Sequence, residues 1–94
     1  MSEQTLPDYL EETETGIKIT LKAPIDIDGA EVSTLTMREP TVQDQLDVDQ
    51  LKGSAATKEV TLLANLCEVT PDDIKKMTMR NYRRVQEAME AFTE

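Results

Sequence analysis

The chain has 94 residues, of which 10 are basic and 19 are acidic, so its formal net charge is −9. This length suits one domain with a modest core, and the acidic balance disfavours binding to nucleic-acid phosphates or anionic lipid surfaces. Two tyrosines and one phenylalanine are too few for a base-stacking platform, and no apolar run approaches the ~20 residues of a membrane span. We therefore expect neither a nucleic-acid partner nor a membrane partner.

The N-terminal residues 1–16 include five acidic residues and no basic residue. They lack the basic region and apolar stretch of a signal peptide, and the single cysteine of the chain cannot form an internal disulfide. These features indicate a soluble protein of a reducing cytoplasm. The apolar residues Leu6, Tyr9 and Leu10 give the segment little to bury, so we predict that residues 1–16 form a flexible acidic tail. The alternative is a segment that docks on a partner or on a neighbouring subunit.

A strict alternation of apolar and polar residues follows over residues 17–27, which is typical of a strand with one buried face. Asp28 and Gly29 then supply the positive φ angles that a tight hairpin turn requires. A return strand is expected over residues 30–38. The sequence therefore predicts a β-hairpin over residues 17–38.

The return strand requires an irregularity in its register. With a two-residue turn, Leu35 and Met37 would face away from the core, because each strand position alternates between the two faces of a sheet. A β-bulge near Ser33 and Thr34 would restore their facing by adding one residue. Pro24 cannot donate to a ladder of hydrogen bonds, so we expect it at an edge or at an irregularity.

The segment Arg38-Glu39-Pro40-Thr41 joins the hairpin to a helical region. Pro40 lacks an N–H group and ends the strand, Thr41 is an N-cap candidate, and Asp44 can complete a capping box. We interpret this hinge as a joint that sets how the hairpin sits on the helices. Arg38 and Glu39 are also candidate partner contacts.

We expect four helices over residues 41–93, two of them short. The first has Val42, Leu46 and Leu51 as a weak inner side and ends before Gly53. The third begins at a Thr-Pro-Asp-Asp signal with Pro71 at its first position, and the last has an apolar stripe that starts at Tyr82.

The second helix, residues 55–67, is apolar over more than one stripe. Its main stripe has the spacing i, i+3, i+4, i+7 and consists of Val60, Leu63, Ala64 and Cys67. Leu62 and Leu66 extend the apolar surface around its side. Either the hairpin or a partner must cover them, and we name both as candidate partner-binding residues.

These elements predict an α+β fold, with an N-terminal β-hairpin followed by three to four short helices and preceded by a disordered acidic N-terminal tail. Residues 17–94 form its single domain, with the hairpin over 17–38 and the helical part over 41–93.

The sequence offers little for catalysis. It has no histidine, no Gly-rich phosphate loop and no nucleophile elbow, and Cys67 lies on an apolar helix face without a basic neighbour close in sequence. Asp26 and Asp28 are explained by hairpin turn chemistry rather than by a calcium loop. We therefore predict that the protein is not an enzyme, and we expect no cofactor and no metal ion.

One basic cluster stands out near the C-terminus, and it consists of Lys75, Lys76, Arg80, Arg83 and Arg84. It is either a solvated face or a docking surface for an acidic segment, such as the N-terminal segment of another subunit.

The order of these motifs resembles the tail assembly chaperones of Mu-like and P2-like tailed phages. The matching stretches are the I-D-I-D-G hairpin, the L-T-M-R-E-P-T-V-Q-D hinge, the LLANL helix, the VTPDDIKKMT turn and the last helix around Tyr82. The residues that carry the resemblance are Asp28, Gly29, Leu35, Arg38, Glu39, Pro40, Thr41, Asp44, Pro71 and Tyr82. We add Tyr82 to the candidate partner-binding residues.

The resemblance implies a non-enzymatic chaperone that coats the tape measure protein, keeps it soluble and leaves as the tail tube polymerises. Its other implied partners are the tail tube protein and a longer, frameshifted form of itself, and a homo-oligomer remains open. It would act in the cytoplasm of the bacterial host and would be absent from the mature virion. The alternative is an acidic phage interaction protein, either a structural head–tail or virion component or a DNA-mimic inhibitor.

Overall fold

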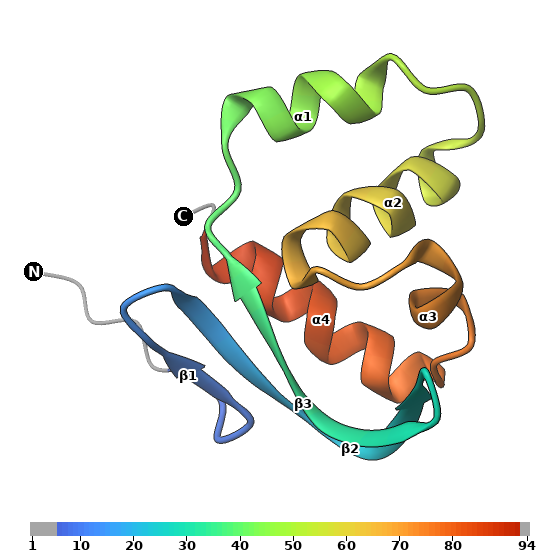
Figure 1. Cartoon of the computed structure of the whole chain (residues 1–94). Coiled ribbons are helices and arrows are strands. Elements are labelled where there is room, and N and C mark those ends of the chain that lie inside the picture. The colour runs from blue at the N-terminus through green and yellow to red at the C-terminus, as the bar shows by residue number, and fades with distance from the viewer. Residues whose placement is uncertain (1–5, 93–94) are drawn as a thin grey trace, which may run out of the picture.

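The computed structural model describes residues 6–92, which form three strands and four helices (Figure 1). The strands are β1 (Leu10–Glu12), β2 (Gly16–Ile27) and β3 (Ala30–Arg38), and the helices are α1 (Val42–Asp49), α2 (Ala55–Cys67), α3 (Pro71–Lys75) and α4 (Met79–Ala91). The strands form one antiparallel sheet in the order β1-β2-β3. The predicted α+β class, the hairpin and the helical second half are confirmed.

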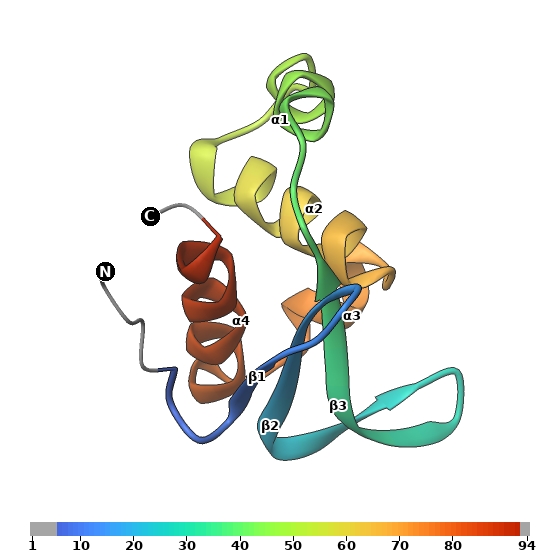
Figure 2. The ribbon, with the colours of Figure 1, turned by 90° about the vertical axis from the view of Figure 1, so that its left-hand side faces the viewer.

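The helices gather on one side of the strands. α4 contacts β2 and α2 contacts β3, so these two helices build the core with the sheet. α1 contacts α2 and stands apart from the strands, joined to β3 by an extended segment (Figures 1 and 2). None of the helices in the described residues is long and apolar enough to cross a membrane.

The hairpin turn forms as predicted, with positive φ values of 54° at Asp28 and 85° at Gly29. The predicted irregularity also exists, but it lies on β2 instead of β3. Thr20 pairs with Thr34 and Ile25 pairs with Val32, so the extra residues sit on β2 between these pairs. The shift is odd in length, so it brings the buried residues of β3 to the core face.

The prediction of an unstructured acidic tail is wrong for residues 6–16, whereas residues 1–5 lie outside the described part. Leu10 pairs with Ile19 in β1 and is buried, and Leu6 and Tyr9 pack against the core. The turn from β1 to β2 closes through a hydrogen bond of 2.7 Å from Thr13 N to the Gly16 carbonyl. Burial of these three apolar side chains against the rest of the fold offsets the conformational entropy that is lost when the neighbouring acidic residues are ordered.

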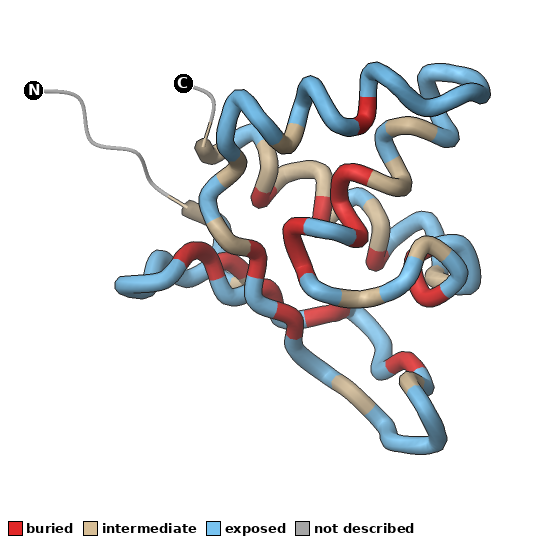
Figure 3. The backbone as a smooth tube through the Cα atoms, turned by 45° about the horizontal axis from the view of Figure 1, so that its top comes forward, coloured by how far each residue is buried: buried red, intermediate tan, exposed pale blue. Residues whose placement is uncertain are grey.

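The expected inner side of α1 is also wrong. Val42, Leu46 and Leu51 are 77%, 49% and 45% exposed, whereas Val48 is the buried residue of this helix. Figure 3 shows that most of α1 is exposed. Val48 lies on the opposite side of the helix from Val42 and Leu46, because residues four apart share a face and residues two apart do not.

Candidate functional site

The predicted hinge is held together by its own side chains. The Arg38 guanidinium donates two hydrogen bonds to the Asp44 carboxylate, at 2.8 and 2.9 Å. Thr41 and Asp44 form the predicted capping box, with Thr41 N donating to Asp44 Oδ2 at 2.8 Å and Asp44 N donating to Thr41 Oγ1 at 3.2 Å. The Arg38 hydrogen bonds, followed by that from Thr41 N, hold the pKa of Asp44 below its usual range.

This geometry supports the interpretation of the hinge as a joint. The guanidinium of Arg38 is already paired with the Asp44 carboxylate, whereas Glu39 is exposed and Pro40 is half-buried. The second predicted start signal forms in the same way, with Thr70 as N-cap and Pro71 at the first helical position of α3.

Leu62 and Leu66 do not form an uncovered surface. They are 7% and 0% exposed and belong to the same core as Leu63, because α1, β3 and α4 all contact α2. Tyr82 is half-buried, and its hydroxyl donates to Glu59 on α2 at 2.5 Å. Burial, and after it the hydrogen bond to Glu59, raises the pKa of Tyr82. The same hydrogen bond connects α4 to α2.

The exposed apolar surface lies on α1 instead. Val42 and Leu46 lie one turn apart on its outer face, and Leu51 follows just beyond its end. A pocket of about 330 Å³ separates α1 from α2, and its lining includes Val48, Leu62 and Met89. α1 therefore packs on α2 through Val48 and leaves the apolar residues of its outer face exposed within residues 6–92.

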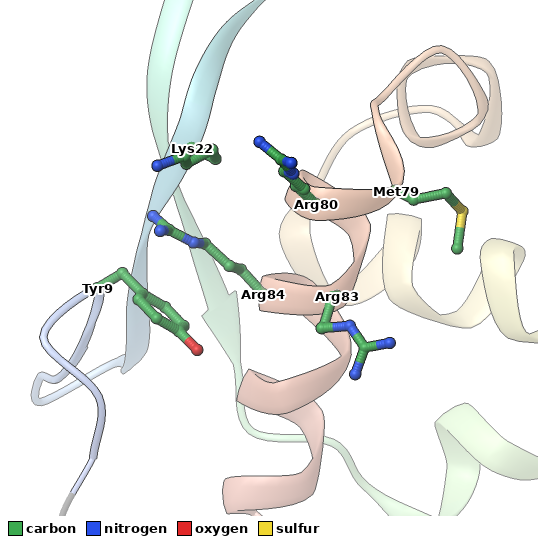
Figure 4. Close-up of a pocket in the computed structure, with 6 residues that line it drawn as sticks. All are labelled: Tyr9, Lys22, Met79, Arg80, Arg83 and Arg84. Carbon is green, nitrogen blue, oxygen red and sulfur yellow. The ribbon is translucent and has the colours of Figure 1, made fainter.

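A second surface lies between β2 and the N-terminal half of α4, and we call it the basic groove. Its volume is about 400 Å³, and its lining residues are Tyr9, Lys22, Met79, Arg80, Arg83 and Arg84. None of these six residues is acidic. Figure 4 shows Arg84 reaching from α4 across to β2, close to Lys22, with the charged end of Arg80 between these two elements, whereas Arg83 and Met79 extend from another side of the helix.

Arg84 has a structural role at the bottom of this groove. Its Nη1 donates to the Thr20 carbonyl at 2.9 Å, and its guanidinium lies 4.0 Å from the centre of the Tyr9 ring. The Tyr9 hydroxyl donates to Glu87, and this bond is the first cause of the raised pKa of Tyr9. These contacts attach the N-terminal segment to α4.

The remaining cations of the groove form no ion pair within residues 6–92. The ion pairs among residues 6–92 are Arg38–Asp44 and Lys76–Asp73, at 2.8 and 3.3 Å. Of the basic cluster seen in the sequence, the fold thus brings Arg80, Arg83 and Arg84 together and adds Lys22 from β2. Lys75 lines a different pocket, and Lys76 is paired with Asp73.

Arg80 also occupies a position that disfavours a positive charge. It lies in the first turn of α4, where the helix dipole favours anions by about 0.3–1 kcal/mol, and this turn has no acidic residue.

The buried polar residue Asn81 binds the backbone of β2 next to the groove, and no sequence pattern had indicated it as a structural or functional residue. Its Oδ1 accepts hydrogen bonds from Lys22 N and Ala23 N at 2.8 and 3.1 Å, and its Nδ2 donates to the Ala23 carbonyl at 2.9 Å. Asn81 thus satisfies the backbone of β2 where its pairing with β3 is interrupted. An asparagine in the first turn of an amphipathic helix was the available signal, but nothing local indicated its partners.

The structure also bears on the metal ligands and the reactive thiol that the sequence raised. Residues 6–92 contain no group of three acidic or thiol side chains that could hold a metal ion. Cys67 is buried, and burial raises the pKa of its thiol to about 12, so the nucleophilic thiolate is strongly disfavoured.

Comparison with protein families gives a match over residues 18–94 to the family described as phage tail assembly chaperone proteins, E, or 41 or 14. No curated protein and no solved structure matched the chain. The match covers the hairpin, the hinge and all four helices, and the resemblance inferred from the motifs is confirmed. The chain therefore belongs to the family of phage tail assembly chaperones.

Proposed function

We propose that this chaperone binds the tape measure protein, keeps it soluble and is released as the tail tube polymerises around it. Its membership of a tail assembly chaperone family carries the proposal, and that family implies a non-enzymatic role with a protein partner. We further propose that it acts in the cytoplasm of the infected bacterium and is left out of the mature virion.

The outer face of α1 is the surface that best suits such a client. A long amphipathic helix needs an apolar surface against which to pack, and Val42, Leu46 and Leu51 are large apolar residues that stay exposed. The strong negative charge of the chain would help to keep a chaperone–client complex soluble. The two leucines proposed from the sequence, Leu62 and Leu66, serve the core that supports this face.

Co-expression with the tape measure protein of the same phage tests the proposal. We expect wild-type chaperone to keep the client in the soluble fraction, and a Val42→Thr/Leu46→Gln double variant to lose this ability while keeping the wild-type melting temperature. The matched control is Val42→Ile/Leu46→Met, which keeps the surface apolar and should keep the client soluble. A client that precipitates equally with and without wild-type chaperone would refute the proposed function.

Fractionation of phage particles tests the proposed release. The chaperone should be present in lysates and absent from purified virions. Stoichiometric recovery in virions would instead favour a structural head–tail or virion component.

A further inference from the structure

We propose that the basic groove binds an acidic segment of the client protein, so that the chaperone holds its client at two chemically different surfaces. This inference rests on the proposed function, and it assigns to the groove an occupant that carries carboxylates next to an apolar side chain. The first observation is the gathering of positive charge. Lys22, Arg80 and Arg84 reach the groove from β2 and α4, in a chain whose formal net charge is −9.

These like charges are brought together without an acidic side chain among the lining residues. Within residues 6–92 neither Lys22 nor Arg80 forms an ion pair, and Arg84 donates to a neutral backbone carbonyl. Neighbouring cations repel one another, so their proximity is more favourable when an anion lies between them. The groove is therefore complementary to negative charge.

The position of Arg80 strengthens this argument. The first turn of a helix favours an acidic residue, and α4 has none there. Arg80 is exposed and its side chain makes no hydrogen bond within residues 6–92, so it does not compensate for this position by a structural contact. Arg80 thus lowers the stability of its helix and is not required for packing, and a binding role is the best explanation for such a residue.

The apolar residues of the groove favour a peptide over a nucleic acid. Met79 lines the groove from another side of α4 and is 75% exposed, and the ring of Tyr9 lines it near β1, already covered on one face by Arg84. An acidic segment that also carries an apolar residue can use both features. A long polyanion would instead extend beyond the groove over a chain whose formal net charge is −9, which disfavours its binding.

The test uses the full chain, an array of overlapping peptides that covers the tape measure protein, and co-expression with the intact client. The groove variant is Arg80→Glu, and the matched control is Lys52→Glu, which makes the same charge change at another exposed position. Arg80→Glu should melt at or above the wild-type temperature, because it places an acid at the positive end of the helix dipole. Loss of binding in this variant is then not a folding defect.

We expect the bound peptides to be acidic and to lose binding when their acidic residues are replaced by glutamine or asparagine. Their affinity should fall about tenfold for Arg80→Glu, should barely change for Lys52→Glu, and should weaken as salt is added. If wild type and Arg80→Glu bind the peptides and protect the client equally, the inference is overturned and the proposed function stands. If wild-type chaperone neither binds a peptide nor protects the client, both fail. Binding of a labelled oligonucleotide that Arg80→Glu abolishes, with no peptide bound, would also overturn the inference.

Discussion

Replacement of Asn81 by alanine tests how the interrupted strand β2 is attached to the helices. The change removes three hydrogen bonds, two accepted from Lys22 N and Ala23 N and one donated to the Ala23 carbonyl. Each is worth about 0.5–1.5 kcal/mol net. Lys22 and Ala23 are exposed, so water can replace part of what is lost, and alanine returns about 0.6 kcal/mol of helix propensity. We expect a net loss of about 2 kcal/mol in the free energy of unfolding.

For a domain of this size, about 2 kcal/mol corresponds to a fall of about 8–16 °C in the melting temperature. Thermal and urea unfolding followed by circular dichroism measure both quantities. Asn81→Asp is an informative companion, because it keeps an acceptor for the two N–H groups but places a buried carboxylate oxygen where Nδ2 donated to the Ala23 carbonyl. It should therefore also destabilise the chain, and less so in acid, where a protonated carboxyl can donate to that carbonyl.

Asn65→Ala is the matched control, because this asparagine is exposed on α2 and its side chain makes no hydrogen bond within residues 6–92. Its effect should stay within about 0.5 kcal/mol. If Asn81→Ala is as mild as Asn65→Ala, then the backbone of β2 is held by its strand neighbours or by water, and the role assigned to Asn81 is refuted.

Three further predictions concern other parts of the molecule. Gly16→Ala should destabilise the chain by more than about 2 kcal/mol in urea unfolding, because its Cβ would lie 1.9 Å from the Met37 carbonyl oxygen; a wild-type midpoint would contradict this. Asp44 has a lowered pKa in the folded state, so its stabilising effect should be complete above its unfolded pKa of about 3.9 and be lost as the pH falls through the folded value. Asp44→Asn should therefore be less stable than wild type at pH 7, and the difference should shrink in acid; a constant difference would refute the role of the Arg38 fork. Cys67 should react with a thiol reagent only after unfolding, and rapid labelling of the native protein at pH 8 would show that this thiol is accessible.

The elements that depend on local chemistry could be predicted from the sequence. The alternation over residues 17–27 and the turn at Asp28 and Gly29 predicted the hairpin, because a strand covered on one face and a positive-φ turn each leave a direct pattern in the chain. The helix starts at Thr41 and Thr70 were equally predictable, since the N-cap residue and its capping-box partner lie only three residues apart in the chain. The order of these motifs was also sufficient to indicate the family.

Three outcomes depended on the tertiary structure, because they arise from residues far apart in the chain. Leu10 became part of a third strand only because β2 offered it a free edge, and no local pattern in its acidic surroundings revealed that edge. The outward face of α1 followed from where the hinge places this helix on α2, since its weak apolar pattern fits either face.

The basic groove is the third outcome, and it depended on the fold most of all. Arg80 and Arg84 are near neighbours in sequence, but Lys22 lies on a different element and reaches them only when β2 packs against α4. A sequence shows how many charges a chain carries and where they stand along it. Whether those charges meet, and whether an acidic side chain lies between them, is decided by long-range packing, which brings distant segments together at distances where charges interact strongly.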